Sequence, residues 1–167
     1  MSAVTKKICM VGDFGVGKTS LIRRFVERQF SDRYLSTVGV KISRKTVTLA
    51  NDQPLKLLIW DLEGKTKFKA IAPTYLQGSS GVLLVADATR TETIQGLTQH
   101  MQDFLTVNPQ GYIAVALNKA DLIDSDARPV LEKHLTAAGD RMLATHWTSA
   151  KTGQNVDLLF ETLANAF

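Results

Sequence analysis

The sequence predicts an α/β protein with a mainly parallel sheet and helices on both of its faces. Apolar, strand-like segments alternate with segments of helical spacing along the whole chain. One early pair of strands is joined by the turn residues 51–53, which predicts a hairpin and so an antiparallel edge strand. With 167 residues, 44% of them hydrophobic and 22% charged, the chain fits one globular domain spanning residues 1–167.

The predicted elements follow in a regular order. We expect strands at 7–11, 41–49, 55–60, 81–86, 112–117 and 141–147, and helices at 19–27, 93–107, 127–138 and 156–166. The strand at 41–49 alternates apolar and polar residues, whereas most of the others are the continuous apolar runs typical of buried strands. Pro73 is expected to shorten or bend a further helix around it. Ligands of such sheets bind outside the carboxyl ends of the strands, so the residues after each strand are the candidates for a site.

Charge and composition exclude several classes of protein. The net charge is +4, but residues 1–70 carry 14 Lys+Arg against 6 Asp+Glu, and residues 71–167 carry 6 against 10. No basic motif interleaved with aromatic residues accompanies this basic half, so we expect no nucleic-acid partner. No apolar run reaches the roughly 20 residues of a membrane helix, and no signal-peptide pattern is present. We therefore expect a cytoplasmic protein, in which the lone Cys9 is buried and inert.

The segment after the first strand has the GxxxxGK[ST] spacing of a P-loop. It reads Gly12-Asp13-Phe14-Gly15-Val16-Gly17-Lys18-Thr19. Glycines at this spacing let backbone N–H groups surround phosphate oxygens, and the amino terminus of the following helix adds its dipole. Lys18 is expected to reach the β- and γ-phosphates, and Thr19 to bind Mg²⁺.

The end of the third strand supplies a second candidate group for the metal. The segment reads Trp60-Asp61-Leu62-Glu63-Gly64. A carboxylate at the end of an apolar strand suits the Mg²⁺ side of a nucleotide site, which assigns this role to Asp61. The backbone N–H of Gly64 is expected to approach a γ-phosphate, because a glycine allows close contact.

The ends of the fifth and last strands predict recognition of guanine. Asn118-Lys119-Ala120-Asp121 follows the fifth strand, and Thr148-Ser149-Ala150-Lys151 follows the last one. A carboxylate held against a base can accept two hydrogens only where a ring N–H and an exocyclic amine lie side by side. Guanine has such an edge and adenine does not, so Asp121 favours guanine.

These four segments, in this order and each at a strand end, resemble the Ras-like small GTPases, and most closely their Rab branch. The resemblance covers almost the whole chain and implies the fold of that family, a P-loop NTPase (Ras-like G domain) with a six-stranded mostly parallel sheet, one antiparallel edge strand and five helices. Residues 35–40 resemble switch I of Rab proteins, and residues 68–71 with Tyr75 resemble switch II. In that family these two segments change conformation with the nucleotide.

The resemblance implies a complete set of site residues. Mg²⁺ is expected on Thr19, Thr37 and Asp61, and the catalytic positions are Lys18, Thr37, Gly64 and Lys65. GTP or GDP is expected to contact Phe14, Gly15, Val16, Gly17, Lys18, Thr19, Ser20, Phe30, Tyr34, Thr37, Gly64, Asn118, Lys119, Asp121, Leu122, Ser149, Ala150 and Lys151. The resemblance also implies effector, exchange-factor and GTPase-activating proteins as partners at the switches, and we expect a monomer.

Several residues depart from the family pattern. Lys65 stands where the family carries the glutamine that orients the attacking water, Glu63 replaces a small residue, and Phe14 replaces a glycine or small residue at the rim of the γ-phosphate. The counterparts of the aromatic triad that Rab proteins present to effectors are Ile42, Trp60 and Tyr75, with one aromatic lost. No cysteine lies near the end of the chain, so we expect no lipid anchor here and a membrane reached, if at all, through a partner.

Three functions follow from these residues. The first is a guanine-nucleotide switch that uses Mg²⁺, hydrolyses GTP slowly and signals by binding effectors. The second is a scaffold that holds GTP or GDP with little or no hydrolysis, which Lys65 and Phe14 favour. The third, an ATP-hydrolysing P-loop protein, is disfavoured by Asp121.

Overall fold

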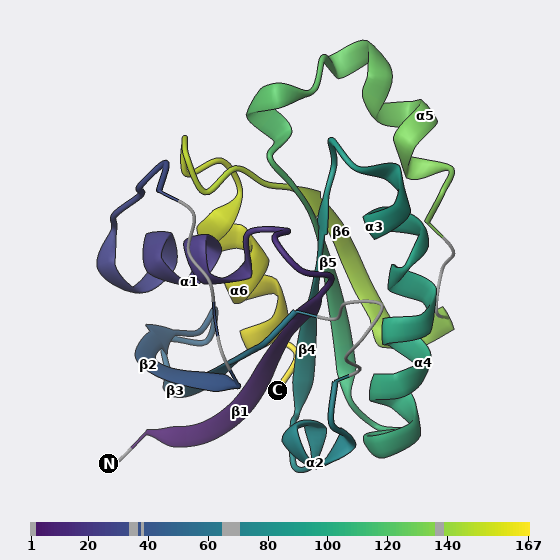
Figure 1. Ribbon diagram of the computed structural model, residues 1–167. Coiled ribbons are helices and arrows are strands. Elements are labelled where there is room, and N and C mark those ends of the chain that lie inside the picture. Colours follow the sequence, from purple (N-terminus) through teal and green to yellow (C-terminus); the bar gives the residue numbers. More distant parts are fainter. Residues whose placement is uncertain (1–2, 34–36, 38, 65–70, 136–138) are drawn as a thin grey trace.

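The computed structural model describes residues 3–33, 37, 39–64, 71–135 and 139–167. Its sheet contains β1 (Val4–Gly12), β2 (Val40–Thr48), β3 (Pro54–Leu62), β4 (Gly81–Asp87), β5 (Tyr112–Asn118) and β6 (Met142–Trp147). Its α-helices are α1 (Lys18–Glu27), α2 (Pro73–Leu76), α3 (Thr91–Gln95), α4 (Leu97–Val107), α5 (Arg128–Glu132) and α6 (Val156–Ala164). Figure 1 shows the sheet between two layers of helices, with α1 and α6 on one face and α3 and α4 on the other.

The six strands form one sheet in the order β2-β3-β1-β4-β5-β6. The pairs β1–β3, β1–β4, β4–β5 and β5–β6 are parallel, and β2 pairs with β3 antiparallel. The predicted mixed sheet with an antiparallel edge hairpin is therefore confirmed. Because five strands run in one direction, their carboxyl ends meet along one edge of the sheet, where the predicted motifs lie.

Each face of the sheet carries its own hydrophobic core. Alternate residues of β1 point to opposite faces, so Ile8 and Met10 belong to the core under α1 and α6 while Cys9 belongs to the core under α2, α3 and α4. On the first face the rings of Phe25 and Phe160 stack with centroids 4.0 Å apart, which packs α1 against α6. Cys9 is buried as predicted, and burial raises the pKa of its thiol.

Two predicted helices differ clearly from their sequence-based bounds. The predicted helix at 93–107 starts two residues earlier and is divided at Gly96 into α3 and α4, so these two count as one of the five predicted helices. The predicted helix at 127–138 is only α5, preceded by a 3-10 turn at Ser125–Ala127, and residues 136–138 lie outside the description. No residue of α5 is buried, and a helix without a packed face rarely extends far.

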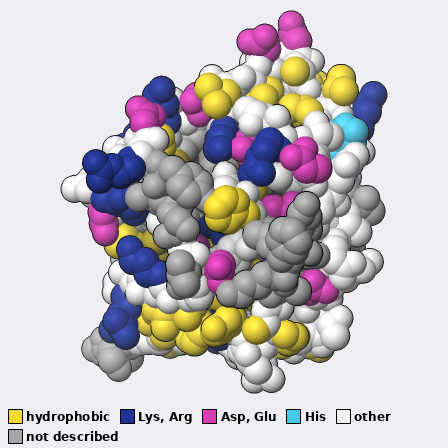
Figure 2. Space-filling view, viewed as in Figure 1, with side chains coloured by type: hydrophobic (Ala, Val, Ile, Leu, Met, Phe, Trp, Pro, Cys, Tyr) yellow, Lys and Arg dark blue, Asp and Glu magenta, His cyan; other side chains and the backbone are white. Residues whose placement is uncertain are grey.

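Pro73 opens α2 instead of bending it, because a proline lacks only a donor that the first helical turn leaves unused. Across the described ranges, no helix is long and apolar enough to cross a membrane. Figure 2 shows Lys and Arg side chains gathered on the side of the molecule that α1, β2 and β3 form.

Candidate functional site

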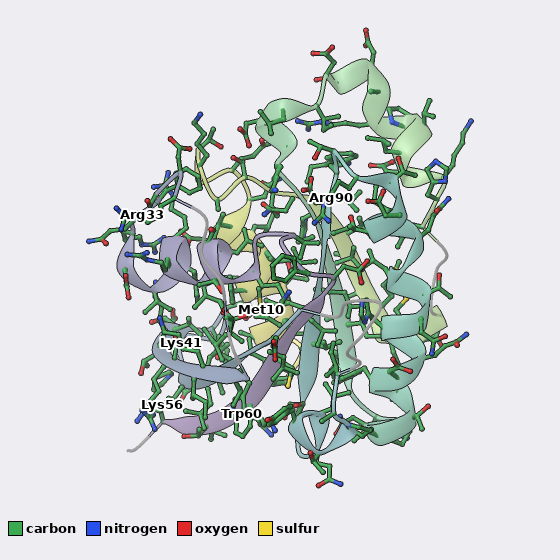
Figure 3. All side chains as sticks on the ribbon, viewed as in Figure 1. Met10, Arg33, Lys41, Lys56, Trp60 and Arg90 are labelled. Carbon is green, nitrogen blue, oxygen red and sulfur yellow. The ribbon has the colours of Figure 1, made fainter. Side chains whose placement is uncertain are left out.

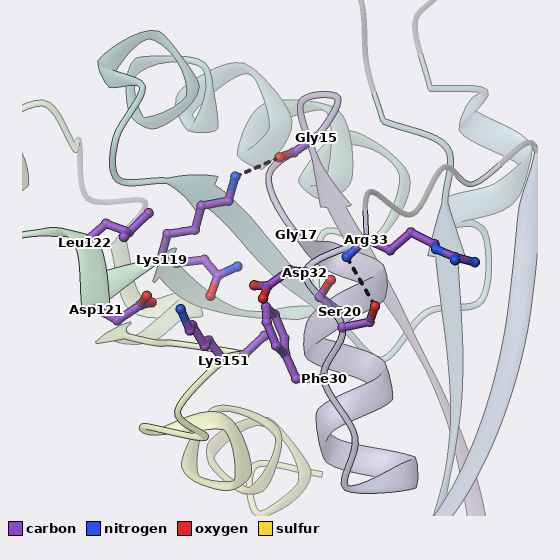
Figure 4. Close-up of a pocket in the computed structure, with 13 residues that line it drawn as sticks. Gly15, Gly17, Ser20, Phe30, Asp32, Arg33, Lys119, Asp121, Leu122 and Lys151 are labelled. Carbon is purple, nitrogen blue, oxygen red and sulfur yellow. Dashed lines mark hydrogen bonds between the residues drawn. The ribbon is translucent and has the colours of Figure 1, made fainter.

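A cavity of about 350 Å³ opens where the carboxyl ends of the strands meet. Figure 4 shows its lining residues converging from the loop after β1, the loop after α1 and the loops after β5 and β6. The lining consists of Gly15, Gly17, Ser20, Phe30, Ser31, Asp32, Arg33, Asn118, Lys119, Asp121, Leu122, Ala150 and Lys151. All of these except residues 31–33 were predicted from the sequence. The loop after α1 has no motif that could have indicated those three.

The loop between β1 and α1 has the conformation that a phosphate site needs. Gly15 and Gly17 have φ angles of 75° and 102°, in the region that favours glycine. A Cβ on Gly17 would also overlap the side chain of Asn118, so glycine is required there on two grounds. Val16 between them is buried, and its carbonyl oxygen accepts a hydrogen bond from Asn118 Nδ2 at 3.1 Å.

Lys18 is a buried cation at the centre of this loop. Its side chain is 6% exposed, and its Nζ lies 3.3 Å from the carbonyl oxygens of both Gly12 and Asp13. Burial lowers the pKa of Lys18 from 10.5 to about 8, although the carboxylates of Asp61 and Asp13 oppose that effect. The ammonium group of Lys18 thus contacts backbone carbonyl oxygens, and the carboxylates nearby do not fully offset the cost of burying its positive charge. Such a buried cation indicates a site for an anion.

Three oxygen-bearing side chains meet beside Lys18. Thr19 Oγ1 lies 2.5 Å from Asp61 Oδ2 and 2.6 Å from Thr37 Oγ1, and Thr37 Oγ1 lies 3.2 Å from Asp61 Oδ2. Asp61 is 1% exposed, burial raises its pKa, and its Oδ1 has no hydrogen-bond partner among the described residues. A buried carboxylate oxygen without a partner, next to two hydroxyls, fits a hard cation such as Mg²⁺.

The far end of the cavity is lined by the motifs after β5 and β6. Ser149 is buried and donates from Oγ to Asp121 Oδ1 at 2.7 Å, which orients that carboxylate. Asn118 is buried, accepts from Thr148 Oγ1 at 3.1 Å, and ties this end to the phosphate loop through Val16. Arg24 on α1 supports the last loop by donating to the carbonyl oxygen of Lys151 at 3.1 Å.

One aromatic and one aliphatic side chain flank this end of the cavity. Phe30 and Leu122 line the cavity from the loops after α1 and β5, and both are exposed. Such exposed apolar side chains beside a polar carboxylate suit a flat, partly apolar ligand such as a base.

A network centred on Asp87 was missed by the sequence analysis. Asp87 ends β4, is buried, and accepts from Lys119 Nζ at 2.8 Å and from Arg90 Nε at 3.2 Å. Although burial acts to raise the pKa of Asp87, hydrogen bonds from Lys119 and Thr89 outweigh it and hold that pKa below its ordinary value. The rule that site residues follow strand ends applied to β4 as well and could have found Asp87.

His100 and Asp13 form a second contact that the sequence did not predict. His100 is buried on α4, and its Nε2 lies 2.9 Å from Asp13 Oδ1. This pair attaches the phosphate loop to the helix layer. Because 87 residues separate the two, no local pattern could have indicated the contact.

The opposite rim of the loop is formed by Phe14, Glu63 and Gly64. A Cβ on Gly64 would lie 2.6 Å from Phe14 Cα, so the two backbones are in close contact. The ring of Phe14 is exposed. Glu63 Oε2 accepts from the backbone N–H of Gly39 at 3.2 Å, so its carboxylate joins the segment before β2 to the end of β3. The predicted Tyr34 and Lys65 lie outside the described residues.

Comparison with known proteins agrees with this geometry. The model of the Ras family matches residues 7–167. The human Ras-related protein Rab-22A is 38% identical over 156 residues, which are 92% of this chain and 79% of the relative. The rat Ras-related protein Rab-31 is 33% identical over 159 residues (95% and 80%), and the human Ras-related protein Rab-36 is 36% identical over 161 residues (95% and 60%).

Proposed function

Since the chain belongs to the Ras family and is a Rab-like, GTP-binding P-loop protein, we propose that it is a Mg²⁺-dependent switch that cycles between GTP and GDP with slow intrinsic hydrolysis. Its 167 residues then form a single G domain. Two observations on either side of the phosphate loop carry the proposal. Asp121 offers a carboxylate to a base in the cavity, and the cluster around Asp61 offers buried oxygens to a metal.

Guanine selectivity rests on the carboxylate of Asp121. Ser149 occupies one of its oxygens, and the group faces the cavity beside Lys119 and Leu122. A carboxylate in this position accepts from the ring N–H and the amine of guanine, whereas adenine would leave it facing an unprotonated ring nitrogen. This argues against the ATP alternative.

The phosphates are bound by the loop, and Mg²⁺ by the oxygen cluster. Lys18 would turn from the carbonyl oxygens of residues 12 and 13 to the β- and γ-phosphates, which explains why it is held charged and buried without an ion-pair partner in contact. Thr19, Thr37 and Asp61 would hold Mg²⁺, which neutralises charge on the phosphates when bound. The two hydroxyls and the unpartnered Asp61 Oδ1 are then satisfied by one ion.

The switch itself would work through Thr37 and Gly64. Thr37 reaches the metal cluster, and Gly64 lies against the phosphate loop at Phe14. Glu63 couples the two segments, because its carboxylate and its backbone N–H both bond to Gly39. Loss of the γ-phosphate would remove a shared ligand of Thr37 and Gly64 and so release both segments together.

Effectors would read the nucleotide state on the surface formed by Ile42, Trp60 and Tyr75. Ile42 pairs with Trp60 across β2 and β3, and Ile42 is exposed. Lys7 lies over the Trp60 ring at 3.7 Å and donates to the carbonyl oxygen of Tyr75 at 2.7 Å, so it fixes these two residues together. Figure 3 shows Trp60 near the lower end of the molecule, whereas Arg90 lies near its upper end. In this proposal exchange factors and activating proteins also bind the switch segments. The protein would act as a monomer in the cytoplasm.

Slow hydrolysis, or its loss in a nucleotide-holding scaffold, is proposed from Lys65 and Phe14. The ammonium of a lysine has no acceptor with which to orient a water as a glutamine carbonyl does. The Phe14 ring, 45% exposed, stands at the rim that an arginine of an activating protein would cross. The carboxylate of Glu63 is bonded to Gly39, so in this state it does not serve as a substitute for the glutamine.

One experiment tests the proposal and separates its two forms. The nucleotide that co-purifies with the protein is identified by chromatography, and conversion of added GTP is then followed in a single turnover. We expect bound GDP or GTP and a slow conversion that requires Mg²⁺. Bound GTP that is never converted favours the scaffold, and co-purified adenine nucleotide or no nucleotide at all contradicts the assignment. Asp121→Asn serves as the matched control, because it alters only the base end.

A further inference from the structure

Arg90 is anchored at the phosphate loop by contacts that the proposed function does not use. Its Nε donates to Asp87 Oδ2 at 3.2 Å, and its Nη2 donates to the carbonyl oxygen of Phe14 at 2.8 Å. Asp87 is itself held by both the backbone N–H and the hydroxyl of Thr89. A planar guanidinium fixed at two points has little rotational freedom left to lose, which is the property of a preorganised group.

The position of Arg90 relates it to the γ-phosphate rim. Phe14, whose carbonyl oxygen it binds, is the residue against which Gly64 packs. Figure 3 shows Arg90 beside the carboxyl end of the central strands, next to the loop after β1. Its charge also contributes to lowering the pKa of Lys18, so the field of Arg90 reaches the lysine at the centre of the phosphate site.

The rest of the guanidinium is available to a ligand. Two of its five N–H groups are used by Asp87 and Phe14, and the described residues supply no partner for the others. The side chain is 38% exposed, so its remaining donors are accessible from solvent, although Arg90 does not itself line the cavity. Arg90 thus combines a fixed charge, free donors and proximity to the loop.

We propose that Arg90 supplies, from within this chain, the positive charge that stabilises the γ-phosphoryl group during hydrolysis; the inference rests on the proposed function. In that step the oxygen of a water bonds to the γ-phosphorus, and the bond from phosphorus to the β–γ bridging oxygen breaks with its electron pair left on GDP. One proton of the water passes to a γ-phosphate oxygen, so the products are GDP and H₂PO₄⁻. Arg90 donates to the oxygens on which negative charge develops.

An internal arginine resolves the difficulty that Phe14 creates. A partner's arginine must cross the rim where the exposed Phe14 ring stands, whereas Arg90 reaches Phe14 from the β4 side through its backbone carbonyl. An arginine that an activating protein inserts typically raises the rate of GTP hydrolysis by about 10³–10⁵-fold. We expect a smaller contribution, roughly 10²-fold, because Asp87 neutralises part of the charge.

The test compares three variants in single turnover with prebound GTP, so that the hydrolysis rate constant is separated from affinity. Arg90→Ala and Arg90→Gln are both expected to slow hydrolysis by roughly 10²-fold, and Arg90→Lys to retain an intermediate rate. Arg90→Gln keeps hydrogen-bonding capacity at Phe14 without the charge, so it distinguishes charge from positioning. Arg23→Ala is the matched control, since it removes an arginine of α1 that is paired with Glu27 on the surface.

A second measurement uses a transition-state mimic. The parent loaded with GDP and Mg²⁺ is expected to bind aluminium fluoride without any partner protein, and Arg90→Ala and Arg90→Gln are expected to lose that binding. Unchanged hydrolysis and fluoride binding in both variants overturns the inference, and a full rate in Arg90→Gln alone reduces Arg90 to a positioning residue and overturns it too. Failure of the parent and of Arg23→Ala to bind GDP at all would instead contradict the proposed function.

Discussion

The base end and the γ-phosphate end of the cleft are built in different ways. At the base end Asn118 and Ser149 are buried, and every motif residue keeps the family's chemistry, including the oriented carboxylate of Asp121. At the γ-phosphate end Phe14 is exposed and Glu63 is bonded to Gly39, and both residues, like Lys65, depart from the family pattern. Apart from Ile42, the departures from the family pattern thus lie at the end where hydrolysis is proposed to occur.

In the proposed function this difference separates recognition from turnover. Recognition would use side chains at the ends of buried strands, whose positions the core determines, so altering them disturbs packed hydrogen bonds such as that from Asn118 to Val16. Turnover would use a surface rim, where a side chain can change without loss of the fold. We therefore expect tight binding and slow hydrolysis in one molecule, and the predictions below test each end by itself.

The largest effect on nucleotide affinity is expected from substitution of Lys18 in the phosphate loop. Lys18→Ala removes the buried cation of the phosphate loop and should weaken both GDP and GTP by about 10³-fold or more, because truncating a buried charge pair costs about 2–5 kcal/mol or more. Equilibrium binding of a fluorescent guanine nucleotide measures it. An affinity equal to that of the parent would remove Lys18 from the phosphate site.

The base end is tested alone by Asp121→Asn. The amide keeps one acceptor oxygen but places a donor against a donor of guanine, so GDP affinity should fall by about 10²-fold. Xanthine has a carbonyl in place of the amine and accepts from the new donor, so xanthine nucleotides should bind better to the variant than to the parent. Competition between guanine and xanthine nucleotides measures the change, and an unaltered preference for guanine places the base elsewhere.

Most of the fold and the recognition residues could be predicted because they follow local rules. Apolar runs and apolar–polar alternation predicted the six strands, and the residues at the ends of β1, β3, β5 and β6 were assigned from motifs whose spacing depends on neighbouring residues alone. The family model and the Rab relatives confirm the family, while the role of each site residue stays a prediction.

What sequence reasoning missed depends on contacts between distant segments. Arg90 reaches Phe14 across 76 residues, and His100 reaches Asp13 across 87, so neither contact leaves a local pattern. The length of α5 was overestimated for a related reason, since helical spacing does not reveal whether a core is present to pack against. Tertiary packing determines both which distant residues come into contact and how far a helix extends.

The pH dependence of GDP affinity should arise from Lys18 at the phosphate end of the cleft and not from the base end. Burial lowers the pKa of Lys18 to about 8 in the free protein, and phosphates favour its charged form, so binding above pH 8 must take up a proton. GDP affinity should then be constant below about pH 8 and fall by up to about tenfold per pH unit above it. Asp121→Asn should keep this slope and Lys18→Ala should lose it; a slope that survives in Lys18→Ala assigns the proton to another group.

The smallest effects are expected at the rim, where the replaced residues lie. Lys65→Gln restores an acceptor for the attacking water, and Phe14→Gly opens the rim, so each should raise the single-turnover rate by roughly several-fold and the pair by more than either. Both variants should bind GDP as the parent does, because neither alters Lys18 or Asp121. If Lys65→Gln accelerates hydrolysis only together with Phe14→Gly, the ring is the dominant obstacle. A parent that hydrolyses GTP within seconds without a partner contradicts slow turnover altogether.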